Sequence, residues 1–191
     1  MFGPGMTRAA FNHSRSSIAP HDHAVFVYDV QDEILPSLEQ FVRGGVEAGE
    51  LPVFVHSFPA ASDALAFLAR NVLEAPSFAQ RGDIVTSGYQ DAFEREGRID
   101  HEHVGSVVAS LQEAARSGGR RAPRIFVDAS KNYFDAGRTD EWFAFEGWLG
   151  PRLTAECGLV CAYRASDLAD PKVLQRVLET HAYRFAATRR R

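Results

Sequence analysis

The stretch "VFVYDVQDEILPSL", residues 25–38, begins with an apolar run typical of a buried strand and continues with the spacing of a helix. In many α/β proteins the turn between such a strand and helix is a glycine-rich loop that holds a phosphate. Residues 29–36 contain no glycine, lysine or hydroxyl, and they place Asp29, Asp32 and Glu33 where the phosphates would lie. The stretch therefore predicts the scaffold of a nucleotide-binding domain without its phosphate loop, and like-charge repulsion makes ordinary triphosphate binding unfavourable.

Similar apolar runs recur along the chain and alternate with segments of helical period. The runs suit strands that are buried on both faces, and they read "HAVFVY", "LPVFVHS", "GDIVTSG", "RIFVDAS" and "GLVCAYR". The helical segments between them cover residues 33–48, 59–72, 101–117, 139–155 and 171–181. This alternation predicts an α/β fold, a three-layer sandwich around a mostly parallel central sheet.

Helix-start signals support these boundaries. We expect Pro59 just inside one helix after Ser57, Asp100 as the N-cap of another, and Asp170 as an N-cap followed by Pro171. The chain shows no internal repeat or linker. Residues 1–20 are rich in glycine, proline and serine and predict a disordered lead-in, which leaves a single domain over residues 21–191.

Composition limits the classes of function. With 191 residues the chain can bury a full core without staples, and its net charge of -4 gives no sign of a nucleic-acid or anionic-membrane surface. Cys157 and Cys161 are too far apart along a strand to bond, so we expect reduced core residues. No apolar run is long enough to cross a bilayer. We expect a cytoplasmic protein with no cofactor.

The order of several motifs resembles two related families. Two segments resemble the RecA-like (KaiC-like) fold of the circadian-clock ATPases. They are the run "FVRGGVEAGELPVFVHS" and the later "RIFVDAS", which is similar to the acidic strand of ATPases. A closer resemblance is to the MEDS sensory domain of methanogen and methylotroph regulators. It is carried by a histidine that opens the first strand, a tyrosine near its end, a helix that ends in Gly-Glu, and a late tyrosine and histidine. These positions are His23, Tyr28, Gly49-Glu50, Tyr163 and His181.

The resemblance covers residues 21–186 and implies a fold as well as a role. It implies a central strand order of 3-2-4-5-1, with "AYRFAA" adding an edge strand, and a stand-alone sensor in place of an enzyme. Asp128, in "VDASKNYF", departs from the pattern of both families.

Two carboxylates qualify as site residues by their position. Asp128 ends an apolar strand, where a carboxylate either caps the next helix or lines a pocket at the carboxyl edge of the sheet. Glu146 lies among Trp142, Phe145 and Trp148, whose spacing of three favours core packing, with a pocket wall or a partner surface as alternatives. An unpaired buried carboxylate is unfavourable, so Glu146 needs a partner, for which we expect Arg164 or His23.

Metal and nucleophile chemistry have weaker support. The histidines of "HDH" (residues 21–23) and "DHEH" (residues 100–103) lack a placed third ligand, so we expect solvated or capping histidines and no metal. Cys161 lies in mid-strand, where a thiol is ordinary packing. Ser130 is not in a glycine-flanked nucleophile elbow.

Three function classes follow. The first is a non-catalytic cytoplasmic sensory domain that binds a small molecule or a regulatory protein near the carboxyl edge of the sheet, with the polar segment "GYQDAFEREGRIDHEH" as its mobile element. The second is a protein-interaction module that can form a homo-oligomer. The third is an unconventional nucleotide-binding ATPase, disfavoured by the missing loop. The candidate ligand-binding residues are His23, Tyr28, Asp128, Glu146, Tyr163, Arg164 and His181.

Overall fold

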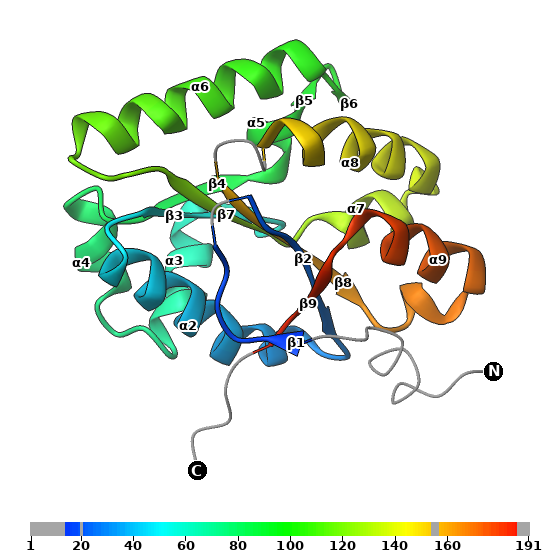
Figure 1. Ribbon diagram of the computed structural model, residues 1–191, viewed down its shortest axis with the longest axis horizontal. Helices are drawn as coiled ribbons and strands as arrows, with labels where there is room; N and C mark the ends of the chain where they lie inside the picture. Colours follow the sequence, from blue (N-terminus) through cyan, green and yellow to red (C-terminus); the bar gives the residue numbers. More distant parts are fainter. Residues whose placement is uncertain (1–13, 20, 154–156, 187–191) are drawn as a thin grey trace.

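Seven parallel strands form the centre of the fold, with helices on both faces (Figure 1). The computed structural model describes residues 14–19, 21–153 and 157–186. The strands of this sheet are β1 (Ser14–Arg15), β2 (His23–Tyr28), β3 (Leu51–His56), β4 (Val85–Gly88), β7 (Pro123–Val127), β8 (Gly158–Arg164) and β9 (Tyr183–Phe185). The predicted three-layer α/β architecture with a mostly parallel sheet is confirmed.

Helices cover the sheet in two groups. One face carries α2 (Ile34–Glu47), α3 (Ala61–Ala69) and α4 (Ala75–Gln80). The other carries α5 (Tyr89–Phe93), α6 (His101–Ser117), α7 (Ser130–Asp135), α8 (Thr139–Leu153) and α9 (Pro171–Thr180). Two 3-10 turns, η1 (Gln31–Glu33) and η2 (Asp167–Ala169), precede α2 and α9, and a short antiparallel hairpin joins β5 (Glu94–Arg95) to β6 (Arg98–Ile99).

The complete strand order is β1-β9-β2-β8-β7-β3-β4, which differs from the expected 3-2-4-5-1. The difference lies at the β2 edge, where the sheet continues through β9 and β1. Within the longer sheet, the five strands expected from the sequence run from β4 to β2 as β4-β3-β7-β8-β2. The segment "AYRFAA" does supply a strand, but β1 pairs with it, so β9 is not the edge.

The alternation of side chains along β2 separates two cores. Phe26 and Tyr28 face α2 and α3, whereas Val25 and Val27 face α8 and its neighbours. All the residues of β2 after His23 are buried, as expected for a strand covered on both faces. On the face that α8 covers, side chains of β2 and β8 are therefore neighbours.

The helix boundaries follow two of the three predicted caps. The side chain of Asp100 accepts a hydrogen bond from the backbone N–H of His103, and that of Asp170 accepts one from Lys172. The third prediction is wrong: α3 begins at Ala61, because Ala60 is extended, so Pro59 precedes the helix.

Residues 88–103 have more regular structure than a long polar loop. They form α5, the β5–β6 hairpin and the start of α6. Glu96 and Gly97 both have positive φ, 51° and 73°, the backbone signature of a two-residue hairpin turn. The mobility expected of this segment stays a prediction.

The described part of the lead-in is folded against the sheet. Residues 14 and 15 pair with β9 as β1, and Ile18 lies in the core beside α2. Residues 1–13 and 20 lie outside the described residues, so the boundary expected near residue 20 stays a prediction.

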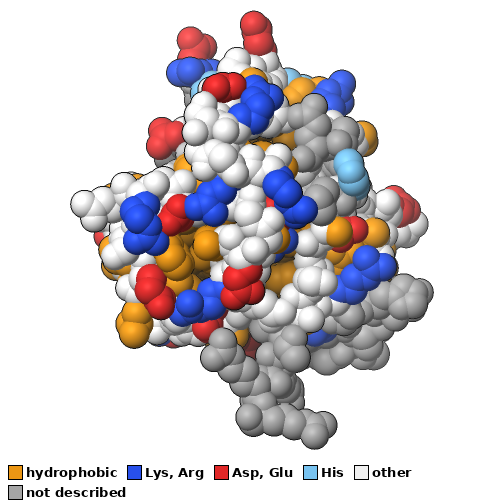
Figure 2. Space-filling view, turned by 60° about the vertical axis from the view of Figure 1, so that its left-hand side comes forward, with side chains coloured by type: hydrophobic (Ala, Val, Ile, Leu, Met, Phe, Trp, Pro, Cys, Tyr) orange, Lys and Arg blue, Asp and Glu red, His pale blue; other side chains and the backbone are white. Residues whose placement is uncertain are grey.

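Basic and acidic side chains are mixed on the face that Figure 2 shows. Among the described residues, none of the helices combines the length and apolar character of a membrane span.

Candidate functional site

Four side chains that can donate lone pairs meet between the sheet and the helices α8 and α9. They come from the first residue of β2, the middle of α8, the middle of β8 and the end of α9. One ligand atom from each lies within 4.8 Å of the others, and the four residues are His23, Glu146, Cys161 and His181. We call this group the core cluster.

Strand register explains two of the four positions. In the parallel pair of β2 and β8, His23 lies opposite Leu159, and Cys161 is two residues further along on the same face. As a result the His23 Nε2 atom lies 3.5 Å from the Cys161 Sγ atom.

The helices supply the other two. Glu146 is buried on the sheet-facing side of α8, and Gly150, one turn later, lets the ring of His23 approach the helix: a Cβ atom there would lie 3.0 Å from His23 Nδ1. His181 follows the last residue of α9 in an extended conformation. Its Nε2 atom lies 3.7 Å from the Glu146 Oε1 atom.

The core cluster is buried and its polar atoms are incompletely paired. Glu146 and Cys161 are each 1% exposed and His181 is 4% exposed. Both carboxylate oxygens of Glu146, and the Nε2 atom of His181, have no hydrogen-bond partner. Such groups carry a desolvation penalty of about 1–3 kcal/mol each, so their joint presence calls for an explanation.

Burial shifts every titration in the core cluster toward the neutral form. It raises the pKa of Glu146 to about 7 and lowers the pKa of His23 to about 4. It also raises the pKa of the Cys161 thiol well above its usual value and holds the pKa of His181 well below 6.5. Burial therefore favours the uncharged form of all four groups, as expected in an apolar interior.

Aromatic groups surround the Glu146 carboxylate. The hydroxyl of Tyr163 accepts a hydrogen bond of 2.9 Å from the indole N–H of Trp142. This hydroxyl and the Cys161 thiol lie close enough to Glu146 to favour its ionised form, although neither carboxylate oxygen has a partner of ordinary hydrogen-bond geometry. The prediction that Trp142 and Phe145 pack in the core is confirmed, since both are 1% exposed.

A second cluster of polar side chains lies at the carboxyl edge of the sheet. It is formed by the last residue of β2 and by residues that follow β2 and β7. The Asp128 Oδ1 atom accepts a 2.9 Å hydrogen bond from the hydroxyl of Tyr28, and the Oδ2 atom accepts one of 2.7 Å from Gln31. Lys131 donates to both Asp128, at 3.4 Å, and Gln31, at 2.6 Å. We call Tyr28, Gln31, Asp128 and Lys131 the edge cluster; it is fully paired.

The seven candidate residues from the sequence therefore do not form one site. His23, Glu146 and His181 belong to the core cluster, and Tyr163 lies beside it. Tyr28 and Asp128 belong to the edge cluster. Arg164 belongs to neither, because its guanidinium pairs with Asp135 and Asp167. Of the two partners expected for Glu146, Arg164 is therefore wrong, and the core cluster does not lie at the carboxyl edge of the sheet.

Sequence reasoning did not place Cys161 in a site, because a thiol in mid-strand was taken as ordinary packing, and the expected absence of a metal stays a prediction. Cys161 and Tyr163 are two residues apart and so share a face of β8, which was the available signal. What lies opposite them depends on how α8 and α9 pack, and no local pattern reports that. The "HDH" and "DHEH" motifs contribute only His23 to the core cluster.

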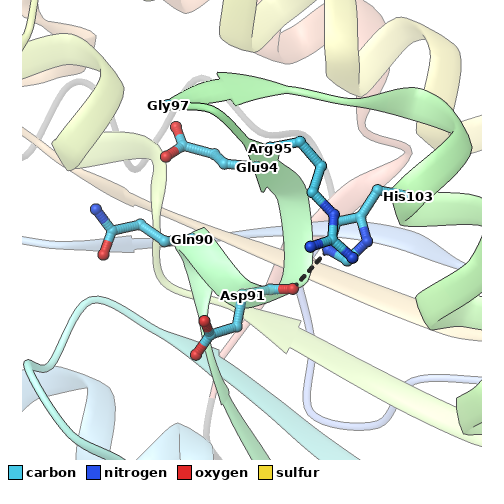
Figure 3. A pocket seen from close by; sticks show the side chains of 6 residues that line it. All are labelled: Gln90, Asp91, Glu94, Arg95, Gly97 and His103. Atoms are coloured by element: carbon cyan, nitrogen blue, oxygen red, sulfur yellow. Dashed lines mark hydrogen bonds between the residues drawn. The ribbon is translucent and has the colours of Figure 1, made fainter.

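A separate hollow of about 370 Å³ lies on the surface of the α5–β6 segment (Figure 3). Its walls are polar, and the imidazole of His103 is hydrogen-bonded to the backbone oxygen of Asp91 at 2.7 Å, which holds α6 against α5. The residues that line the hollow are Gln90, Asp91, Glu94, Arg95, Gly97 and His103.

One comparison with known proteins finds a family. Residues 22–182 match the sequence model of MEDS, described as the methanogen/methylotroph, DcmR sensory domain. No curated protein matches the chain. The matched range contains both clusters and the hollow.

Proposed function

The chain belongs to the MEDS family of sensory domains, and from this premise we propose that it is a non-catalytic signalling domain whose input site is the core cluster. A small ligand that binds there would change the packing of α8. The observation that carries the proposal is the buried Glu146 carboxylate with no hydrogen-bond partner on either oxygen, next to an unpaired imidazole nitrogen.

Energetics support a ligand at this place. Buried polar atoms are nearly always paired in folded proteins, and an unpaired set is a recognised mark of function or of an absent ligand or ion. A ligand that binds these atoms would recover their desolvation penalty, so it would bind the folded state selectively and stabilise it.

The turn after β2 argues against a nucleotide enzyme on the same scaffold. In a phosphate loop, free backbone N–H groups receive the phosphate oxygens. Here the backbone N–H of Asp29 donates to the carboxylate of Glu33 at 2.9 Å, so an acidic side chain takes the place of the anion. Asp32 lies on the same turn and is paired with Arg70, which follows α3.

Aromatic contacts offer a route from the input site to a surface. On α8, Phe145 packs on Phe93 of α5 at 4.9 Å between ring centroids, and Trp148 stacks on His101 of α6 at 4.3 Å. Both contacts lie within one helical turn of Glu146. A small shift of α8 would therefore be felt by α5 and α6, which we propose as the output surface.

Thermal unfolding with a panel of small ligands tests this function. At 100 times its dissociation constant a ligand adds about 2.7 kcal/mol, a rise of roughly 5–10 °C for a domain of this size. We expect such a rise to disappear in Glu146→Gln and to persist in Glu47→Gln, a matched change at an exposed position on α2. ATP with magnesium should have no effect. A rise with ATP, or a ligand response that ignores Glu146, would overturn the proposal.

A protein partner is the second candidate, and the hollow beside α5 favours it. Asp91, Arg95 and His103 offer polar groups of both signs on its rim, which suits a protein surface more than an apolar molecule. Charge reversal at Asp91 and Arg95 that abolished partner capture while ligand binding persisted would identify this surface as the output. Cys157 and Cys161 are both buried and form no disulfide, which agrees with the cytoplasmic location that we propose.

A further inference from the structure

We propose that the core cluster binds one divalent transition-metal ion of the zinc class, with His23, Glu146, Cys161 and His181 as its ligands. This proposal rests on the proposed function, because the ion would be the ligand of the sensor. The evidence for the ion itself is geometric: four potential ligand atoms lie within 4.8 Å of one another.

The ligand types select the class of ion. Two imidazoles, a thiolate and a carboxylate are the groups that hold zinc and its first-row neighbours. Magnesium and calcium take oxygen ligands almost exclusively, and Glu146 is the one oxygen donor among the four residues.

The spacing is close to that of a tetrahedral site. With zinc bond lengths of about 2.0–2.3 Å, neighbouring ligand atoms lie roughly 3.3–3.6 Å apart. The His23 Nε2 to Cys161 Sγ distance is 3.5 Å, and the His181 Nε2 to Glu146 Oε1 distance is 3.7 Å. The widest separation is within 4.8 Å, so the ligand atoms would have to approach by about 1 Å on binding an ion.

The lone pairs that a metal needs are the atoms that lack partners. The Nδ1 atom of His181 lies 2.8 Å from the carbonyl oxygen of Val177, to which it donates, so Nε2 presents its lone pair toward Glu146. This is the atom of His181 without a partner, together with both oxygens of Glu146.

An outer shell holds the ligands in place, as around known metal sites. His181 is fixed by Val177, and the ring of His23 is hydrogen-bonded to the backbone of Thr180. Next to Glu146, the hydroxyl of Tyr163 is in turn fixed by Trp142. Each ligating group except the thiol thus has a neighbour that restricts its orientation.

Charge balance favours a divalent ion. One thiolate, one carboxylate and two neutral imidazoles carry two negative charges, which a divalent cation cancels inside an apolar core. On binding, the thiol proton leaves to solvent, as does the carboxyl proton where Glu146 holds one. His23 is the one member of the core cluster that is partly exposed, so the site comes nearest to solvent there.

Cobalt and zinc titrations of chelator-treated full-length protein test the site. Cobalt(II) replaces zinc in such sites and reports a thiolate ligand by its charge-transfer absorption. We expect one equivalent to bind, with a zinc dissociation constant below about 1 μM. If neither ion binds more tightly than about 1 mM, the metal site does not exist.

Two variants and one control locate the ion. Cys161→Ser should abolish the thiolate absorption, whereas Cys157→Ser, at the other buried cysteine, should leave it unchanged. Glu146→Gln keeps the shape of the side chain and removes its charge. We expect it to weaken binding by more than the 10–100-fold that outer-shell changes cause. Equal binding by Cys161→Ser and Cys157→Ser would overturn the assignment.

A second measurement separates the metal site from the sensory function. Amide hydrogen exchange in residues 89–117 should change when zinc binds. If zinc binds at these residues and exchange there does not change, the metal site stands and the sensory function fails. If zinc does not bind but another ligand gives a thermal shift that depends on Glu146, the sensory function stands and the metal assignment fails.

Discussion

The edge cluster and the core cluster each place a carboxylate inside the protein, but only one of them completes its hydrogen bonds. Asp128 is 0% exposed and accepts hydrogen bonds on both oxygens, from Tyr28, Gln31 and Lys131. Glu146 is 1% exposed and accepts none. The lesson is that position alone misleads. The carboxylate at the carboxyl edge, where ligands of α/β proteins usually bind, is hydrogen-bonded on both oxygens, whereas the one on the sheet-facing side of α8 is unpaired.

Removal of the paired carboxylate should produce the largest loss of stability. Asp128→Ala leaves the buried Tyr28 hydroxyl, Gln31 and Lys131 without their shared acceptor, which we expect to destabilise the protein by about 3 kcal/mol. Urea unfolding measures the loss. Asp128→Asn keeps one acceptor oxygen and should lose less. A loss below about 1 kcal/mol for the alanine variant would mean that Asp128 is not a structural link.

His56 sharpens the comparison, because it lies at the carboxyl edge without completed hydrogen bonds. It is 1% exposed, and neither ring nitrogen has a partner of ordinary hydrogen-bond geometry, although the backbone of Phe58 lies close by. Burial lowers its pKa below the usual 6.5. The unfolded chain therefore takes up a proton below pH 6.5 that the folded protein resists, so stability falls as pH drops through that range. Between pH 6.5 and 5 the wild type should lose more stability than His56→Phe, and above pH 7 the stability profiles of the two proteins should be parallel. Profiles that stay parallel down to pH 5 would show that His56 titrates normally.

The aromatic link between the core cluster and the output surface should contribute little to stability. His101 is exposed and stacks on Trp148, and such ring pairs contribute about 0.5–1.5 kcal/mol. His101→Ala should therefore lower the unfolding free energy by about 1 kcal/mol and leave ligand binding at the core cluster intact. We expect it to reduce the ligand-induced change in hydrogen exchange of α6. An unchanged response would place the route elsewhere, with the Phe145–Phe93 contact as the next site to test.

The smallest effect on stability is expected from the unpaired carboxylate itself. At pH 6, below the pKa of about 7 of Glu146, both the wild-type side chain and the glutamine of Glu146→Gln are neutral. We expect the two ligand-free proteins to differ by about 0.5 kcal/mol or less, since no hydrogen bond is lost. A loss close to that of Asp128→Ala would show that Glu146 is a structural group, and the contrast between the two clusters would disappear.

Much of the fold was predictable, because it depends on local patterns. Buried parallel strands appear as apolar runs, and Asp100 and Asp170 are recognisable N-caps, which is why the corresponding strands and helices were identified correctly. The resemblance of the sequence supplied an order for five strands. The short strand β1 was missed, because two residues carry no periodicity. The hairpin at Glu96 and Gly97 was taken for a loop, because its strands are only two residues long.

The site was harder to predict, because it depends on packing between distant segments. Glu146 was recognisable as a carboxylate among aromatic residues, and His23 was one of its two expected partners. The contact of Glu146 with His181 depends on how α8 and α9 lie against the sheet. Arg164 was a plausible partner by charge, but it points to the acidic residues Asp135 and Asp167 at the end of β8. Sequence thus identifies buried polar residues, while the fold decides which of them meet.

The central claim is tested most directly by amide hydrogen exchange with and without zinc. The measurement compares the wild-type protein with Glu146→Gln and Asp128→Asn. The claim is that occupancy of the core cluster reaches α5 and α6. It predicts that zinc alters exchange in residues 89–117 of the wild type and of Asp128→Asn, leaves α2 on the opposite layer unchanged, and has no effect in Glu146→Gln. Exchange in residues 89–117 that stays the same while zinc is bound would contradict the claim.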